Sequence, residues 1–382
     1  MAAPRDIHTK AFVVPALGSP FVLKDVILDE VRQDEVLVDM KYTGICHTDI
    51  VVQTGGMPIG SYPAVLGHEG AGIVQSVGSG VKSVAVGDTV LLSFHTCGHC
   101  KACEADECGS CPGATEINFL KNARSGSDTR SPIRLADGTP VHGQFFGQSS
   151  LSKMAVVTEK SVVKVDARPD ELKYLPPLGC GYLTGAGTVL NVLKPQQDES
   201  IMIIGMGAVG LAALMAAKAL GVQRIIAVDL LDTKLQLASA LGATDVINTA
   251  QSVGLETTVK NSMASGVNFV LDTTGVGMLL EASVKCLAHA GTLALVGVPS
   301  SQTNLSINAL DLLVSCKRII GVIEGRSNPH VLIPQLFQMF REGKMPIDRL
   351  AEIYPAQSLH IALQDLKSGQ VSAPSTQYVS TS

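Results

Sequence analysis

Nine cysteines make sulfur the most informative chemistry of this 382-residue chain, because five of them fall between Cys97 and Cys111. Cys97, Cys100 and Cys103 are each separated by two residues, and Cys111 follows within the same stretch. Structural zinc sites prefer a closed tetrahedral shell of Cys or His, and close spacing allows one loop to supply all ligands. The stretch therefore predicts a zinc-binding lobe, in which Cys108 is an alternative to Cys111.

Disulfide bonds are the other use of such a cluster, and the start of the chain helps to decide between the two. Residues 1–10 are polar, and the apolar residues 11–17 are too few for a signal core and include Pro15. In a reducing compartment, clustered cysteines bind metal more often than they pair as disulfides. We expect a soluble cytoplasmic protein whose cysteines hold zinc.

A catalytic metal needs an open coordination position, so three protein ligands are enough. The candidate ligands lie far apart in the sequence: Cys46, His68 (followed directly by Glu69) and Cys180. Taken singly, a cysteine beside glycines is typical of a small buried residue, and a lone histidine is typical of a satisfied polar group. Spacing alone does not unite these three residues.

A glycine-rich motif, G-M-G-A-V-G at residues 205–210, follows an apolar run and opens an Ala/Leu-rich stretch. In that context its glycines allow a tight turn, a close approach to a pyrophosphate, and close packing of helix and strand. The N-terminus of the helix then faces the phosphates. Asp229 lies at the distance expected for binding the ribose hydroxyls, and its charge would repel a 2′-phosphate, so the motif favours NAD over NADP.

Composition limits the remaining possibilities. Hydrophobic residues make up 46% of the chain and charged residues 16%, which is enough apolar content for large cores. The net charge of −5 comes without a long run of one sign and argues against a dedicated nucleic-acid binder. No apolar stretch reaches the length of a membrane span.

Two different patterns divide the chain near Leu183. Before it, short apolar runs at residues 35–38, 72–74 and 89–92 alternate with Gly, Pro and Asp turns, which predicts a partly closed β-barrel. From residue 200 onward, expected strands at 201–204, 224–228, 269–271 and 292–296 alternate with helices to about residue 220 and over 233–241. Such alternation predicts a parallel sheet covered on both faces. A further amphipathic helix is expected over residues 334–341.

These motifs together resemble the zinc-containing medium-chain dehydrogenase/reductase family, the alcohol dehydrogenases, over nearly the whole chain. The matching signatures run in family order: G-I-C-H-T-D at 44–49, G-H-E-G-A-G at 67–72, the four-cysteine lobe, L-G-C-G at 178–181, and the glycine motif with Asp229. The stretches F-F-G-Q-S-S at 145–150 and G-V-I-E-G at 321–325 resemble the aryl- or benzyl-alcohol dehydrogenase group most.

The resemblance implies an α/β protein in which a doubly wound, parallel-sheet Rossmann domain (183–320) is inserted into a GroES-like β-barrel catalytic domain (1–182 and 321–382). It implies two zinc ions per chain. The catalytic ion would be bound by Cys46, His68 and Cys180, and the structural ion by Cys97, Cys100, Cys103 and Cys111.

Further roles come with the resemblance. Asp49 would orient His68, and Glu69 would lie near the metal, with a buried, paired carboxylate as the alternative. The residues expected to bind the cofactor are His47, Thr184, Gly205, Gly207, Ala208, Val209, Gly210, Asp229, Lys234, Val296 and Val298. The residues expected to line the substrate pocket are Thr48, Ser93, Phe94, Phe145, Phe146 and Val298.

The implied reaction is reversible hydride transfer between a primary alcohol, aromatic or bulky, and NAD, with Thr48 as the first proton carrier. Many relatives complete the proton relay with a histidine where this chain has Val51. We therefore expect either His47 or ribose hydroxyls and water to take that part, although relatives also carry a basic residue at position 47 against the pyrophosphate. A second difference from relatives lies at residues 371–373, where this chain lacks their Arg or Lys. This difference predicts weaker cofactor binding.

Other interpretations within and outside the family stay open from sequence alone. They are a zinc reductase working on an aldehyde or ketone of a specialised metabolite, a non-catalytic binding protein that keeps the fold, and a zinc-free quinone reductase. The intact set of Cys46, His68, Cys180 and Thr48 argues against the binding protein. Both expected zinc sites argue against the quinone reductase. Relatives form dimers or tetramers, so a homo-oligomer is expected.

Overall fold

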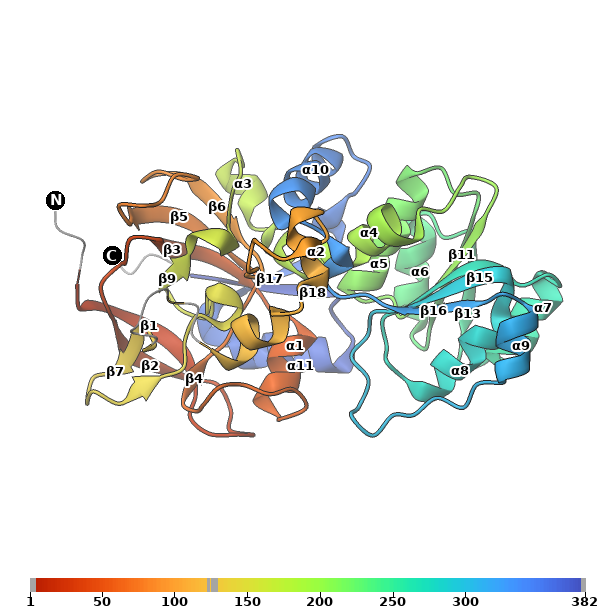
Figure 1. Cartoon of the computed structure of the whole chain (residues 1–382), viewed down its shortest axis with the longest axis horizontal. Coiled ribbons are helices and arrows are strands. Elements are labelled where there is room, and N and C mark those ends of the chain that lie inside the picture. The colour runs from red at the N-terminus through yellow and green to blue at the C-terminus, as the bar shows by residue number, and fades with distance from the viewer. Residues whose placement is uncertain (1–4, 122–123, 125–129, 379–382) are drawn as a thin grey trace. The chain divides into compact units, whose positions relative to one another are not determined.

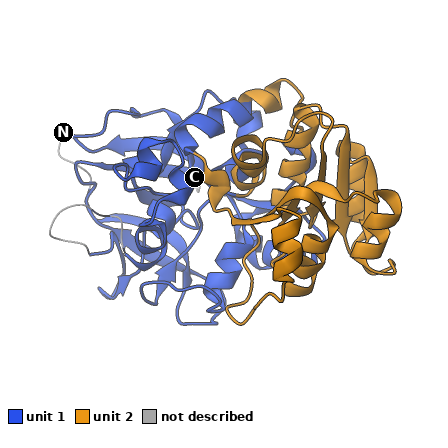
Figure 2. Cartoon of the chain, turned by 45° about the vertical axis from the view of Figure 1, so that its right-hand side comes forward, with its two compact units in different colours: residues 1–180, 328–337, 347–382 blue, residues 181–327, 338–346 orange. Residues whose placement is uncertain are grey.

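The computed structural model describes residues 5–121, 124 and 130–378, and its contacts divide the chain into two compact units. Unit 1 comprises Met1–Cys180, Asn328–Phe337 and Ile347–Ser382, and unit 2 comprises Gly181–Ser327 and Gln338–Pro346 (Figure 2). The second unit is therefore inserted into the first.

Unit 1 is built mainly from two sheets. In the five-stranded sheet the order is β4 (Ala64–Val65), β1 (Ile7–Val14), β2 (Val22–Leu28), β7 (Ile133–Leu135) and β8 (Pro140–Val141). In the seven-stranded sheet the order is β10 (Val162–Lys164), β6 (Thr89–Leu92), β5 (Gly70–Val77), β3 (Glu35–Gly44), β18 (Ala373–Gln377) and β17 (Ala351–Pro355), with β9 (Met154–Thr158) also paired to β3. The expected strands at 35–38, 72–74 and 89–92 lie within β3, β5 and β6.

The order β6–β5–β3 explains how distant residues meet at one edge of the larger sheet. Both pairs are antiparallel, so the end of β3 and the end of β6 lie beside the start of β5. The backbone N–H of Gly44, at the end of β3, donates to the carbonyl of Glu69 at 2.9 Å. Beyond β6, the hydroxyl of Ser93 donates to the carbonyl of Gly179 at 2.6 Å. Segments 44–49, 67–70 and 178–180 are thereby held together.

The helices of unit 1 are short, and one differs from the expectation. They are α1 (His47–Gln53), α2 (Lys101–Glu104), α3 (Pro169–Leu172) and α11 (Leu359–Ser368). The helix expected over 334–341 is α10 and begins earlier, since it spans Pro329–Arg341 with Pro334 inside it. A proline suits the first position of a helix, where its missing N–H is not needed, and Asn328 caps that end by accepting from the N–H of His330 at 3.0 Å.

Unit 2 is a six-stranded parallel sheet covered by helices. The strand order is β13 (Asp245–Asn248), β12 (Arg224–Asp229), β11 (Ser200–Ile204), β14 (Val267–Asp272), β15 (Leu287–Leu295) and β16 (Arg318–Gly321). The helices are α4 (Gly181–Gly187), α5 (Ala208–Ala219), α6 (Asp232–Leu241), α7 (Leu255–Ser262), α8 (Gly277–Cys286) and α9 (Ala309–Val314). This strand order, with a reversal between β11 and β14, is that of dinucleotide-binding sheets. Figure 1 shows the helices α4 to α9 around the strands of this sheet.

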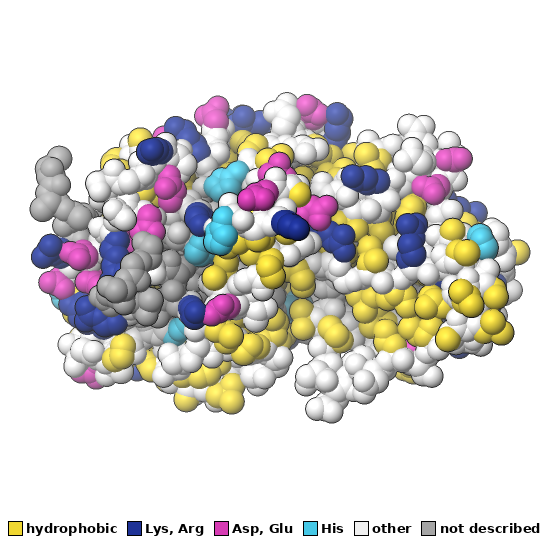
Figure 3. All heavy atoms as spheres, viewed as in Figure 1, with side chains coloured by type: hydrophobic (Ala, Val, Ile, Leu, Met, Phe, Trp, Pro, Cys, Tyr) yellow, Lys and Arg dark blue, Asp and Glu magenta, His cyan; other side chains and the backbone are white. Residues whose placement is uncertain are grey.

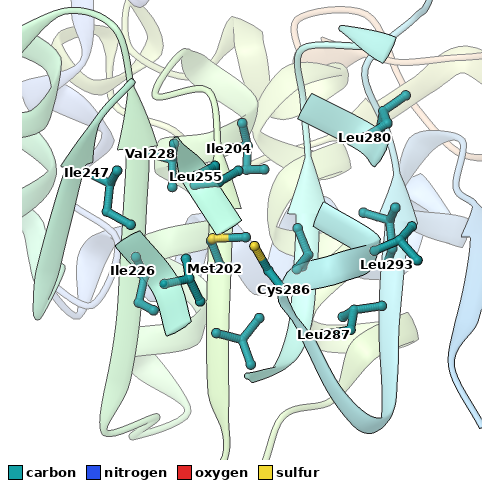
Figure 4. Packing of buried hydrophobic residues seen from close by; sticks show 14 residues of the cluster. Met202, Ile204, Ile226, Val228, Ile247, Leu255, Leu280, Cys286, Leu287 and Leu293 are labelled. Atoms are coloured by element: carbon teal, nitrogen blue, oxygen red, sulfur yellow. The ribbon is translucent and has the colours of Figure 1, made fainter. Parts of the chain in front are cut away.

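Both faces of this sheet are buried, which explains its continuous apolar strands. Met202 and Ile204 point to one face, where they pack with Leu255 of α7 and Leu280 of α8 in a buried cluster (Figure 4). Ile203, with the opposite orientation, lies against α5 on the other face, where its side chain is 3.5 Å from the position a Cβ on Gly210 would take. Within the described part of the chain, no helix is long and apolar enough to cross a membrane.

Candidate metal centres and nucleotide site

The sheet edge of unit 1 brings together Cys46, His68, Glu69 and Cys180, whose candidate ligand atoms all lie within 4.8 Å of one another. Cys46 follows β3 and caps the N-terminus of α1, whereas His68 and Glu69 directly precede β5. His68 is fully buried, and Cys180 is 8% exposed. The three ligands that spacing alone did not unite thus form one cluster with the neighbouring Glu69, in which Cys46 is half-buried and the other residues are buried.

His68 is oriented for metal binding by its buried neighbour. Its Nδ1 lies 3.2 Å from Oδ1 of Asp49, which also accepts from the N–H of Gly67 at 2.9 Å. Its Nε2 is buried without a hydrogen-bond partner. An unpaired buried nitrogen next to two sulfurs costs free energy unless it binds something. Two sulfurs and one imidazole are a zinc-binding set, so these residues fit a zinc ion.

The electrostatics of the cluster favour deprotonated sulfur. The Cys180 and His68 side chains hold the pKa of the Cys46 thiol well below its usual range. Burial acts to lower the pKa of His68, but the Asp49 carboxylate and the Cys46 sulfur outweigh it, so the pKa of His68 lies well above its usual value. A cation in this position would replace the proton that these neighbours attract.

Glu69 reaches the cluster because a glycine stands opposite. A Cβ added to Gly44 would lie 2.0 Å from Oε2 of Glu69, so a larger residue at position 44 would displace that carboxylate. Glu69 is 3% exposed. The first residue of the G-I-C-H-T-D signature therefore makes room for the carboxylate near the candidate metal ligands.

The expected proton carriers lie on α1, directly after Cys46. The Thr48 hydroxyl is 3.7 Å from the sulfur of Cys46, which places it beside the cluster. His47, the first residue of α1, is exposed, and Val51 is half-buried. His47 is therefore open to solvent within unit 1, as a proton relay or a phosphate contact requires.

The four expected ligands of the lobe also come together. The sulfurs of Cys97, Cys100, Cys103 and Cys111 lie within 4.8 Å of one another, and Cys108 is outside this group. The structure therefore groups Cys111, and not Cys108, with the other three expected ligands. Cys108 begins the 3₁₀ turn Cys108–Ser110, and this turn carries the chain back so that Cys111 completes the set.

Two thiols of the lobe have pKa values shifted in opposite directions from the usual value of a cysteine. The backbone N–H of His99 lowers the pKa of Cys97 to about 6, whereas burial raises the pKa of Cys103 to about 12. Four sulfurs this close cannot all ionise without a compensating cation. The lobe thus has the chemistry of a closed structural zinc site.

The glycine motif lies between β11 and α5, as the sequence predicts. Gly205 has a φ of +90°, and a Cβ on Gly210 would lie 1.8 Å from the carbonyl oxygen of Gly205. Only glycine allows this turn and this close packing of helix against strand. Gly207 caps α5, and Ala208 and Val209 form its first turn, so backbone N–H groups point out of the helix toward the site.

Asp229, at the end of β12, closes this turn. Its carboxylate accepts from the N–H groups of Met206 at 2.7 Å, Leu230 at 2.7 Å and Leu231 at 3.0 Å. It lies at the carboxyl end of the sheet, the edge where such sheets bind nucleotides. Lys234 is nearby on α6 and half-buried.

The other expected cofactor residues lie in unit 2 but outside the glycine turn. Thr184 on α4 donates its hydroxyl to Oε2 of Glu324 at 3.1 Å, and both residues are buried. Val296 and Val298 follow β15, and Val298 is 48% exposed.

Comparison with known proteins agrees with both halves of this description. Residues 32–167 match the alcohol dehydrogenase GroES-like domain, and residues 208–341 match the zinc-binding dehydrogenase family. The chain is 35% identical over 371 residues to the geraniol dehydrogenase of Castellaniella defragrans, with 96% of this chain and 97% of that protein covered. The chain belongs to the zinc-containing alcohol dehydrogenases of the medium-chain dehydrogenase/reductase family.

Two solved structures show the same fold over nearly the full length of this family member. The alcohol dehydrogenase zinc-binding domain protein of Burkholderia ambifaria has a TM-score of 0.92 at 38% identity, covering 98% of this chain and 99% of its own. The benzyl alcohol dehydrogenase of Acinetobacter calcoaceticus has a TM-score of 0.91 at 37% identity, covering 98% and 100%. The predicted family and the predicted GroES-like and Rossmann fold are confirmed, and an oxidoreductase acting on alcohol groups follows from the relatives.

Sequence reasoning missed one buried residue of this alcohol dehydrogenase, Gln148. Its Nε2 donates to the carbonyls of His68 at 2.8 Å and Ser93 at 3.0 Å, and its Oε1 accepts from the N–H of Gly70 at 3.1 Å. It thus joins the segments around His68 and Ser93 with one side chain. The only sequence signal for Gln148 is its place in the F-F-G-Q-S-S stretch, which by itself indicates a subgroup and a pocket wall.

Of the residues expected to line the substrate pocket in unit 1, Thr48 is half-buried and the other four are almost fully buried. Ser93 and Phe145 are 0% exposed, Phe94 is 2% exposed and Phe146 is 6% exposed. The rings of Phe145 and Phe146 lie against the imidazole of His68. They therefore surround the candidate metal ligand, whereas contact with a substrate stays a prediction.

Proposed function

We propose that the protein is a zinc-dependent, NAD-linked dehydrogenase that interconverts a primary alcohol carrying an aromatic or bulky group with its aldehyde. The observation that carries this proposal is the cluster of Cys46, His68 and Cys180, in which Asp49 contacts one nitrogen of the buried His68 and leaves the other unpaired. Such a set provides three ligands and leaves a fourth position open for an oxygen of the substrate.

Each residue of this cluster has a separate task. Bound there, zinc would act as a Lewis acid that lowers the pKa of the substrate hydroxyl, while a bound nicotinamide would accept hydride. Asp49 keeps the proton of His68 on Nδ1 and fixes the ring. The Glu69 carboxylate, buried in the same group, would enter the ligand set during ligand exchange.

The proton released from the alcohol would leave through the start of α1. Thr48, beside the Cys46 sulfur, would accept it on its hydroxyl oxygen and pass its own proton outward. The exposed His47 would then carry it to water, in place of the histidine that relatives have at the position of Val51. Its alternative task is to contact the cofactor pyrophosphate. In His47→Gln, a loss of the alkaline limb of the pH profile with unchanged NAD affinity supports the relay, and an effect on NAD affinity alone excludes it.

The cofactor assignment rests on the turn between β11 and α5. The free N–H groups at the start of α5 suit a pyrophosphate, and the Asp229 carboxylate suits two ribose hydroxyls. A 2′-phosphate would meet the negative charge of Asp229, so we assign NAD. The absence of Arg and Lys from residues 371–373 predicts weak binding and fast release of the reduced cofactor. Tight NAD binding in a calorimetric titration would contradict that prediction.

The substrate class rests on the relatives and on residue sizes around the cluster. One relative is named a geraniol dehydrogenase and one structural neighbour a benzyl alcohol dehydrogenase. Ser93, an expected pocket residue, has a small side chain, which would leave room for a ring or branched group. The opposite working direction, reduction of an aldehyde or ketone on a larger metabolite, uses the same residues and is the alternative.

The deciding experiment follows NAD reduction by absorbance with ethanol, longer primary alcohols, benzyl and cinnamyl alcohols, geraniol and secondary alcohols. NADP and a zinc chelator are the controls. Chelator-sensitive activity with NAD on the aryl alcohols supports the proposal. A protein that contains two zinc ions per chain but oxidises none of these alcohols favours the reductase alternative, which aldehyde reduction with NADH then tests.

We also propose that two copies associate through unit 2. β16 is an end strand of the described six-stranded sheet, so no described strand pairs with its outer side. The adjacent helix α9 exposes Leu310 (66%), Leu313 (73%) and Val314 (61%). Hydrophobic side chains gather over this part of unit 2 (Figure 3). A symmetric pairing of β16 with a second copy would cover both features, and Leu313→Lys should then yield monomers in light-scattering chromatography.

A further inference from the structure

The imidazole of His68 is held by aromatic rings as well as by Asp49. Phe146 stacks on it with ring centroids 4.6 Å apart and planes inclined by 27°. Phe145 meets it edge to face, with centroids 5.6 Å apart at 85°. A single hydrogen bond at Nδ1 leaves a ring free to tilt, and the two phenyl rings remove that freedom because they contact its face and its edge.

These two rings also contact a residue that follows the four-cysteine lobe. Phe119 lies 5.5 Å from Phe145 and 5.0 Å from Phe146, centroid to centroid. It belongs to the turn Glu116–Leu120, which begins shortly after Cys111. Phe119 is 8% exposed, so the cluster is buried from the end of the lobe to His68.

Asn118 fastens this turn to the other end of the lobe. Its amide oxygen accepts from the N–H of His95 at 2.8 Å, and its amide nitrogen donates to the carbonyls of His95 at 2.9 Å and Ala114 at 2.8 Å. His95 lies just before Cys97, and Ala114 donates its N–H to the carbonyl of Cys111 at 3.0 Å. The position of Phe119 therefore depends on the chain at both ends of the four-cysteine set.

The loop that carries Phe145 and Phe146 is itself tightly restrained. Gln144 and Phe146 have φ values of +55° and +56°, a region that bulky residues rarely adopt. The loop is fixed in that conformation by hydrogen bonds from the Gln144 amide to Glu35 at 3.0 Å and from Ser161 Oγ to the carbonyl of Phe146 at 3.0 Å. Unfavourable backbone angles persist only where the surroundings enforce them, and here they aim a ring at His68.

We propose that Phe119, Phe145 and Phe146 form a positioning cluster that fixes the His68 imidazole and couples metal binding in the four-cysteine lobe to metal binding by Cys46, His68 and Cys180. The coupling rests on the two zinc sites of the proposed function. Loss of metal from the lobe frees both ends of the chain around Asn118, which releases Phe119 and then the two rings on His68. A less restrained imidazole loses its metal faster, because the ligand atom is no longer held in place.

The first test compares Phe146→Leu with Phe146→Tyr and with Phe12→Leu. Phe12 is 5% exposed in β1 and has no ring contact with the cluster, so its variant controls for the loss of a buried ring in unit 1. The rate of zinc release to a chromogenic chelator and the absorption spectrum of the cobalt-substituted protein are measured. Leucine at position 146 should speed release of one of the two zinc ions by about tenfold. Tyrosine at 146 and leucine at 12 should leave the rate unchanged.

The second test examines the coupling itself and uses residues outside the Cys46 cluster. Cys111→Ser empties the lobe, and it should speed release of the remaining zinc by about fivefold or more in a chain that keeps Phe119. In a Phe119→Leu background, where the link is already broken, Cys111→Ser should add no further increase. Circular dichroism checks the fold of each variant. If the Phe146 variants do not fold, Phe119→Leu and Phe119→Tyr take the place of Phe146→Leu and Phe146→Tyr in the first test.

Equal release rates in all folded variants, or effects of Cys111→Ser and Phe119→Leu that simply multiply, would overturn the coupling. So would a tyrosine variant as defective as the leucine variant, because burial alone would then explain the effect. A wild-type protein that holds no zinc at all would instead remove the proposed function on which this inference rests.

Discussion

Replacing Asp49 by alanine should weaken metal binding at the Cys46 cluster by about 100-fold, and replacing it by asparagine by about tenfold. The Asp49 carboxylate is fully buried and contacts three groups. Oδ1 accepts from the N–H of Gly67 at 2.9 Å and lies 3.2 Å from Nδ1 of His68. Oδ2 accepts from the N–H of Cys46 at 3.2 Å.

The two variants differ in what they leave behind. Asparagine can keep the contacts of Oδ1 while losing the charge and the bond to Cys46, whereas alanine removes all three contacts. The expected losses in metal affinity correspond to about 1.4 kcal/mol for asparagine and about 2.7 kcal/mol for alanine. Alanine also leaves two buried backbone N–H groups unpaired, at about 1–3 kcal/mol of unfolding free energy each, so its melting temperature should fall as well.

Competition with a calibrated zinc chelator measures the affinity, and cobalt absorption reports the geometry of the cluster. Asp88→Asn is the matched control, because Asp88 also accepts a backbone N–H, from Ala85 at 2.8 Å, but lies in a turn away from the cluster. Wild-type zinc affinity and an unchanged cobalt spectrum in both Asp49 variants would refute the view that Asp49 orients His68.

Three further predictions address the four-cysteine lobe, the buried His142 and the choice of cofactor. Cys111→Ser should lower the zinc content from two ions per chain to one by mass spectrometry, whereas Cys108→Ser should keep two; equal loss in both would contradict the selected ligand set. Burial lowers the pKa of His142 to about 4, so the folded state binds fewer protons than the unfolded state and stability falls as the pH drops from about 6.5 toward 4. Calorimetry should therefore show that, between pH 7.5 and pH 5, the unfolding free energy of the wild type falls by about 2 kcal/mol more than that of His142→Gln. Equal decreases in both proteins would exclude His142 as the source of this pH dependence. Asp229→Asn should raise the preference for NADP, as the ratio of kcat/KM values, by about tenfold, or about 1.4 kcal/mol, because the negative charge facing a 2′-phosphate is gone; an unchanged ratio would place cofactor choice elsewhere.

Much of the fold could be predicted because its signals are local. The apolar runs of β3, β6, β11 and β12 are bounded by turn residues, and the glycine motif is typical of one strand–helix connection. The boundary of α10 could not be predicted in the same way. Pro334 resembles a helix start in sequence, but Asn328 supplies the actual cap and the helix begins at Pro329, and only the folded chain shows which cap is used.

Part of the candidate site could likewise be predicted from local sequence, and part could not. The four-cysteine lobe could be predicted from spacing, because a short loop cannot keep its sulfurs far apart. The choice of Cys111 over Cys108 could not, since it depends on the turn Cys108–Ser110 that carries the chain back. Gln148 was missed because its partners are backbone groups of two distant segments, and such groups are the same for nearly every residue type.

The sequence by itself determined the family, the two kinds of domain and the residue types available for zinc and nucleotide chemistry, because motif order and local periodicity carry that information. The resemblance implied that Cys46, His68 and Cys180 share an ion and that Asp49 orients His68, but spacing did not bring them together. The tertiary structure shows these residues within contact distance and adds that Phe145 and Phe146 pack against the ring of His68. The physical reason is the antiparallel order of β3, β5 and β6, which places three chain segments at one sheet edge. Contacts between distant residues follow from strand pairing and packing, and neither is encoded in the spacing of the residues that meet.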